Sequence, residues 1–186
     1  MGLYGQSFKE VIATAQVDGS TITAAAATSM LPASAKAVIP ANTWAIGKRL
    51  SIFASGRISS VITTPGTARF DVRMGATVVF DGLAILLDTV AAHTTVGWTL
   101  EIEMTCRAVG TTGNFFGVGK WTCEDILGVP ATAPKGVLTA ILPWNTAPAV
   151  GANFDTTASQ VLDLFFTQTV ATGSCTLHQF QASIQN

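Results

Sequence analysis

Apolar and polar side chains alternate with a period of two along much of the chain, most regularly over Trp98–Ala108. One side of this segment is apolar, and the other carries threonine, glutamate and arginine. Such alternation indicates a β-strand with one face buried and the other exposed to solvent. The apolar side consists of Trp98, Leu100, Ile102, Met104, Cys106 and Ala108.

Similar patterns occur along the rest of the chain. Phe115–Cys123 follows the turn Gly110–Asn114, which predicts that it pairs antiparallel with Trp98–Ala108. Further strands are predicted at Lys36–Ile39, Arg49–Ile58, Ala68–Met74, Thr77–Phe80 and Val137–Leu142.

The two ends of the chain also carry strand patterns. Phe8–Gln16 is a predicted strand, and Asp18–Ser20 predicts a hairpin-type turn before the next one. The alanine run Ala24–Ala27 is too short for a stable isolated helix. Near the other end, Gln160–Val170 and Thr176–Ile184 are predicted to form a closing hairpin.

Short strand patterns separated by turns, with few amphipathic helical patterns, are typical of an all-β domain. Long strands joined by long loops, such as Pro143–Ser159, favour a jelly-roll-like antiparallel β-sandwich over a tight barrel. We expect about eight to ten strands and an extended N-terminal segment. Residues 1–47 would form an N-terminal arm and the first strands, and residues 48–186 the main sandwich, within one domain.

Composition narrows the possible functions. Only 11% of the 186 residues are charged, the net charge is −1 and the mean hydropathy is +0.45. Balanced charge without a run of lysine or arginine argues against a nucleic-acid partner. The longest apolar runs, such as Leu83–Leu87, are far shorter than a membrane helix, and Met1–Glu10 has no signal-peptide pattern. Outward strand positions carry threonine instead, which occurs 26 times.

The three cysteines, Cys106, Cys123 and Cys175, lack the spacing of a structural zinc site. In a hairpin centred on Gly110–Asn114, the first two would stand several residue steps apart, too far for a disulfide. We expect reduced, half-buried thiols in a protein that folds in a reducing cytoplasm.

Candidate catalytic motifs are weak. Gly117–Lys120 fits neither the Walker nor the dinucleotide spacing, so strand glycines that admit a close neighbour are the better interpretation. Glu101 and Glu103 share a strand face, as a glycosidase pair can, but a solvated charged face with cross-strand partners explains them equally. His93 and His178 have neither metal-ligand nor triad spacing. We expect neither an enzyme nor a cofactor.

Four tryptophans raise the question of a binding surface. Trp98 and Trp121 lie on predicted strands and are expected in the core. Trp44 and Trp144 lie in predicted loops, where an exposed ring can stack on a sugar or contact a neighbouring subunit. We favour the subunit contact.

A surface so poor in charge is a solubility risk for an isolated protein. It is tolerated where partners cover it, because long-lived interfaces are more apolar and less charged than free surface. We therefore expect a subunit of a permanent assembly.

Four segments, Gly56–Gly75, Trp98–Gly110, Phe154–Phe166 and Thr176–Phe180, resemble in pattern the small virion proteins of tailed bacteriophages. The resemblance spans residues 50–184 and includes no catalytic motif. It implies a jelly-roll-like virion component that forms a homotrimer and is assembled in the host cytoplasm.

The expected function is that of a capsid decoration (cement) protein, which would bind the major capsid protein on the outside of a head and stabilise the shell by mass action. Met1–Gln16 is the expected contact arm. A tail or baseplate structural protein of the same fold and a receptor- or glycan-binding module are the alternatives. We expect no nucleic acid and no membrane as partner. The candidate partner contacts are Leu3, Tyr4, Phe8, Trp44 and Trp144.

Overall fold

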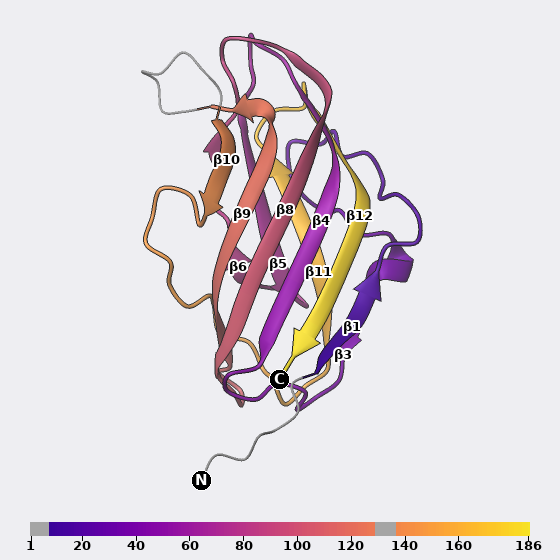
Figure 1. Cartoon of the computed structure of the whole chain (residues 1–186), viewed down its shortest axis with the longest axis vertical. Helices are drawn as coiled ribbons and strands as arrows, with labels where there is room; N and C mark the ends of the chain where they lie inside the picture. The colour runs from indigo at the N-terminus through magenta and orange to yellow at the C-terminus, as the bar shows by residue number, and fades with distance from the viewer. Residues whose placement is uncertain (1–7, 129–136) are drawn as a thin grey trace.

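The computed structural model describes residues 8–128 and 137–186, which form a β-sandwich of two antiparallel sheets (Figure 1). The expected all-β class is confirmed, and the 3-10 turn η1 (Ala33–Ala35) is the one helical element in these two ranges. The described residues contain twelve strands rather than eight to ten, because three of these strands have only two or three residues. They are β1 (Lys9–Thr14), β2 (Ala27–Ser29), β3 (Val38–Ile39), β4 (Arg49–Ser60), β5 (Thr67–Met74), β6 (Thr77–Asp81), β7 (Ile85–Leu86), β8 (His93–Ala108), β9 (Asn114–Leu127), β10 (Val137–Leu142), β11 (Gln160–Gln168) and β12 (Ser174–Gln185).

The front sheet of Figure 1 has the strand order β1-β12-β4-β8-β9-β10. The back sheet has the order β2-β11-β5-β6, with β3 paired to β11 and β7 paired to β5. The pairing is nested, because β1 pairs with β12, β2 with β11, β4 with β8, and β5 with β6. Strands from the beginning and the end of the chain therefore lie side by side in both sheets.

The inward side chains of the two sheets form one apolar core. Along β4, buried and outward residues alternate without interruption, as the sequence pattern predicts. Phe70 on the back sheet joins the two layers, with its ring centroid 5.1 Å from Trp98, 4.9 Å from Trp121 and 5.3 Å from Phe166. The expected core positions of both tryptophans are confirmed. Each fully buried side chain of this size stabilises the fold by roughly 1.5–3 kcal/mol.

The N-terminal region is more firmly part of the sandwich than expected. Lys9–Thr14 pairs with β12 as an edge strand, and Ile22 further along still bridges Cys175 of that same strand. The expected hairpin at Asp18–Ser20 is therefore wrong, because the chain keeps following β12. Within the contact arm expected over Met1–Gln16, Lys9–Thr14 is a paired edge strand and not a free arm. Its contact with a partner stays a prediction.

The closing hairpin expected near the C-terminal end is wrong as well. The segments Gln160–Val170 and Thr176–Ile184 do contain strands, but β11 pairs with β5 and β12 pairs with β4. The turn at 172–174 thus carries the chain from the back sheet to the front sheet. Alternation identifies the buried face of a strand and leaves its neighbour unspecified.

The antiparallel pairing of β8 with β9 is confirmed, in a register that aligns Trp98 with Cys123 and Cys106 with Phe115. The two cysteines lie at opposite ends of this ladder, and none of the three cysteines forms a disulfide. All three are fully buried rather than half-buried.

The glycine-rich start of Gly117–Lys120 has a packing role. A Cβ added at Gly117 would lie 2.6 Å from Cδ2 of Phe80 and 2.9 Å from Cγ of Met104. The expectation that a strand glycine admits a close neighbour here is confirmed.

Candidate functional site

The structure separates the residues expected to contact a partner. Leu3 and Tyr4 lie outside the described residues. Phe8 is 63% exposed and directly precedes β1. It is therefore available to a neighbouring molecule.

The two loop tryptophans are not exposed rings. Trp44 is only 6% exposed, and its ring meets Phe115 edge-on at a centroid distance of 4.7 Å. The expectation of an accessible Trp44 is wrong, because its loop folds over the end of the sandwich and adds the indole to the core. Trp144 is half-buried against the core, and its backbone N–H donates to the Gly82 carbonyl at 2.9 Å.

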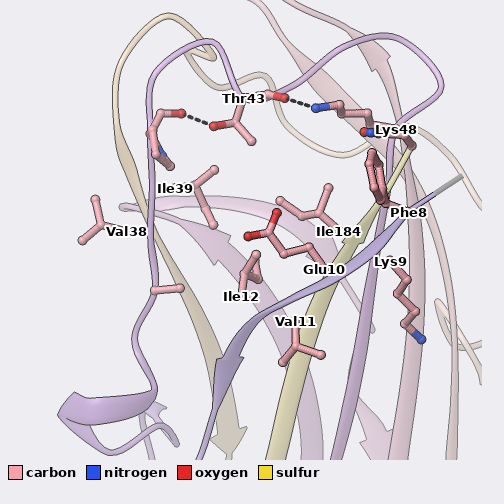
Figure 2. Close-up of a pocket in the computed structure, with 13 residues that line it drawn as sticks. Phe8, Lys9, Glu10, Val11, Ile12, Val38, Ile39, Thr43, Lys48 and Ile184 are labelled. Atoms are coloured by element: carbon pink, nitrogen blue, oxygen red, sulfur yellow. Dashed lines mark hydrogen bonds between the residues drawn. The ribbon is translucent and has the colours of Figure 1, made fainter. Parts of the chain in front are cut away.

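A groove of about 730 Å³ opens beside Phe8, between β1 and the chain around β3 (Figure 2). Ile12, Ile39 and Ile184 contribute apolar walls. The Glu10 carboxylate extends into the groove, with Ile39 on one side and Ile184 on the other.

The rim of the groove exposes large apolar side chains. Val38 is 64% exposed and Val11 is 49% exposed, in addition to Phe8. At one end, Lys48 Nζ donates to the Thr43 carbonyl at 2.8 Å, which anchors the loop that closes the groove. The lining of the groove thus combines exposed apolar side chains with Lys9 and Lys48, and Lys48 fixes one end of it.

Strand edges form both sides of this groove. β1 is the outermost strand of the front sheet, and β3 pairs with β11 through two residues only. Backbone groups on a strand edge are ready to pair with another chain. In the described parts of the molecule Glu10 makes no ion pair. An extended segment that brings apolar side chains and one cation would fit this arrangement.

A second polar feature, on the outer face of the back sheet, is internally neutralised. Asp71 is fully buried and accepts from Arg73 Nε at 2.6 Å, while the Arg73 guanidinium lies 3.7 Å from the centroid of the Phe165 ring. Three cations and three carboxylates take part, so the network leaves no net charge for a ligand. The other pairs are Arg69–Asp81 at 2.7 Å and Lys36–Asp163 at 2.7 Å.

The carboxylates considered as a glycosidase pair have ordinary partners. Glu101 lies 3.2 Å from Lys120 Nζ, and Glu103 lies 2.9 Å from Arg49 Nη2, all on the exposed face of the front sheet. These are the cross-strand contacts expected of a solvated strand face.

Asp88 and His93 form a shielded pair, with His93 Nε2 2.9 Å from Asp88 Oδ2. Burial raises the pKa of Asp88, but the hydrogen bond with His93 and the backbone N–H groups of Val90 and Ala91 outweigh it. The pKa of Asp88 is therefore lowered from its ordinary value of 3.8. This pair closes the turn that leads into β8.

Within residues 8–128 and 137–186, no three side chains of the metal-ligating types cluster as a metal site would require. The same ranges contain no helix long and apolar enough to span a membrane. Comparison with known proteins adds no relative: no protein-family model matches the chain, and no curated protein matches it significantly.

Proposed function

We propose that this protein is a virion structural protein, and specifically a capsid decoration protein on the outside of a bacteriophage head. The observation that carries the proposal is the groove between the two sheet edges, whose rim exposes Phe8, Val11 and Val38. Apolar side chains gathered on an open strand edge are an aggregation hazard unless a partner covers them. A chain with 11% charged residues has little polar surface with which to offset that hazard.

The strand order supports a virion role. Nested pairing of the first with the last strands, distributed over two sheets, is the arrangement of a jelly roll, and we infer that fold here. In this assignment β9 and β10 extend the front sheet beyond β8. Jelly rolls build many viral capsid domains, but the fold also serves lectins and enzymes. The groove is therefore the main support for the proposed capsid contact, and the inferred jelly-roll fold is consistent with it.

The proposed mechanism is linkage between binding and assembly. A protein that binds the assembled shell and not its separate subunits stabilises the shell by mass action. The groove would take an extended segment of the major capsid protein, with a lysine or arginine opposite Glu10 and apolar side chains against Ile12 and Ile39. Contacts between copies in a homotrimer would cover further low-charge surface.

Location in the particle tests the proposal most directly. An antibody raised against the purified protein would be applied, with gold label, to phage particles from the source culture, and copies per particle would be read from a stained gel. We expect label on heads and hundreds of copies. Label on tails with a few to tens of copies would favour the tail protein, and particles without the protein would overturn a virion role.

Substitutions at the rim test the contact surface. Val38→Ser should weaken binding to heads prepared without the protein by at least roughly tenfold, because a buried valine contributes about 1.5–3 kcal/mol. Val90→Ser is the matched control, since Val90 is 54% exposed on a loop outside the groove and Val38 is 64% exposed. Equal binding of both variants would exclude the groove as the contact.

A further inference from the structure

A second hollow lies on the outer face of the front sheet and shares no residue with the groove. Its volume is about 590 Å³, and residues of β12, β4, β8, β9 and β10 line it. A hollow of this size is within the range of small-ligand sites.

The floor of this hollow is a single cross-strand row of small polar side chains. The register aligns Gln179 with Ser55, Ser55 with Thr99, and Thr99 with Thr122. Ser55 Oγ donates to Gln179 Oε1 at 3.2 Å. Adjacent strands are about 4.8 Å apart, so the row presents hydroxyl and amide groups at regular intervals.

Gly97 neighbours Thr99 on the same face of β8, and its missing side chain explains why the surface is hollowed here. Gly97 carries no side chain, and a Cβ added there would meet only Glu124 Oε1, at 3.4 Å. The β8–β9 ladder ends at the pair of Trp98 with Cys123. Beyond this pair, Glu124 accepts the Gly97 N–H at 3.1 Å, and across the hollow Arg57 Nη1 donates to the Thr95 carbonyl at 2.9 Å. Backbone groups thus hold a carboxylate and a guanidinium around an open centre.

Two strand irregularities lie at opposite ends of the hollow. The β12–β4 register shifts between Leu177 and Gln179, and the β10–β9 register shifts between Val137 and Thr139. The first shift leaves His178 as an extra residue on β12, and the second leaves residues 123–126 of β9 opposite Leu138 alone. His178 and Leu138 both line the hollow. A bulge re-aims a side chain and often does so next to a functional site. His178 Nδ1 lies 3.0 Å from Asp18 Oδ2, and Leu138 is 60% exposed, so one end is polar and the other aliphatic.

The chemistry of the lining points to one class of ligand. Hydroxyl groups both donate and accept, the Arg57 guanidinium only donates, and the Glu124 carboxylate only accepts. One guanidinium and one carboxylate cancel in charge, which favours a neutral ligand over a phosphate or a cation. A sugar offers many hydroxyls and an apolar C–H face, which Leu138 could cover. We propose that this hollow binds a neutral carbohydrate, a mono- or disaccharide unit at the end of a glycan.

The site is independent of the proposed contact with a phage head, and each proposal can fail alone. A multimer would present several copies of the site, so individually weak binding would be strengthened through multivalency. A glycan array is therefore the appropriate first assay.

The full-length protein would be applied to an array of neutral and sialylated oligosaccharides, and hits would be quantified by titration calorimetry with the free sugar. Gly97→Val should fill the hollow with an ordinary strand residue and weaken binding at least tenfold. Thr105→Val on the same strand and outside the hollow is the control, and it should bind as the parent protein does.

Arg57→Gln gives a second variant that leaves the hollow open and removes a charged donor, and it should weaken binding several-fold. It decides the question if Gly97→Val does not fold. The proposal is overturned if no neutral glycan binds, if binding is confined to sialylated glycans, or if neither variant weakens it.

Discussion

Gly97 on β8 and Gly117 on β9 allow the energetic cost of tight packing to be measured with little influence from the unfolded state. Gly117 on β9 faces the core, and an added Cβ would lie 2.6 Å from Phe80 Cδ2. Gly97 on β8 faces the outer hollow, and its added Cβ would meet one atom only, at 3.4 Å. Neither has a positive φ, so alanine is compatible with both backbones.

The expected magnitudes follow from these distances. Carbon atoms pack best at about 3.5–4.0 Å, so alanine at position 117 requires a shift of roughly 1 Å in its surroundings. Phe80 and Met104 are 3% and 0% exposed, so neither can swing into solvent. Overpacking of this kind costs about 1–3 kcal/mol, while replacing glycine by alanine restricts the unfolded chain and returns about 0.4–1 kcal/mol. Gly117→Ala should therefore destabilise by roughly 0.5–2 kcal/mol, and Gly97→Ala should stabilise by about 0.4–1 kcal/mol.

Urea unfolding followed by tryptophan fluorescence would measure both variants at a common m-value. The unfolded-state contribution is similar in the two, so the difference between them, about 1–3 kcal/mol, reports the contact alone. Phe80→Val removes the clashing ring atom, and Gly117→Ala in that background should lose much of its penalty. Equal changes for the two alanine variants, or an unchanged penalty beside Phe80→Val, would refute the packing argument.

Three further outcomes are expected. Asp71→Asn should lower the free energy of unfolding by about 1.5–3 kcal/mol, because the buried Asp71 carboxylate binds Arg73. Glu103→Gln, which breaks the exposed ion pair with Arg49, should change the free energy of unfolding by at most ~1 kcal/mol. Equal effects of the two substitutions in urea unfolding would contradict this difference. Because the pKa of Asp88 is lowered in the folded protein, its ionised carboxylate stabilises the fold at pH values above the ordinary pKa of 3.8. This stability is lost as the pH falls through the pKa that Asp88 has in the folded protein. Asp88→Asn should therefore flatten the acid limb of the stability–pH curve below about pH 4. An acid limb identical to that of the parent protein would exclude this role. The three cysteines are 4% exposed or less, and burial raises the pKa of the Cys106 and Cys175 thiols. Ellman's reagent should therefore label the protein only after denaturation. Rapid labelling of the native protein would contradict the burial of the cysteines.

The sequence predicts strands well where the two faces of a strand differ. Arg49–Ile58 and Trp98–Ala108 are confirmed as parts of β4 and β8 because each has one apolar and one mostly polar face. β2 and β7 were not predicted, since two or three residues are too few to show a period. The crossing at 172–174 was also missed, because no local pattern states which sheet receives the next strand.

The candidate sites are harder to predict from the sequence. Phe8 is exposed, as a partner contact must be, and its contact stays a prediction. The sequence places Trp44 at the surface wrongly, because a loop position does not reveal what the loop covers. The outer hollow consists of serine, threonine and glycine, which form no motif in sequence and converge only through strand register. The register shift that brings His178 to the hollow likewise becomes visible only in the folded sheet.

The position of β12 between β1 and β4 has a consequence for synthesis of the protein. During translation, β12 leaves the ribosome after both of its neighbours, so β1 and the facing edge of β4 have no pairing partner until β12 has been synthesised. The nascent chain must keep these apolar segments from associating with other chains throughout that time. Slower elongation would prolong this exposure, and loss of β12 would leave both edges open permanently.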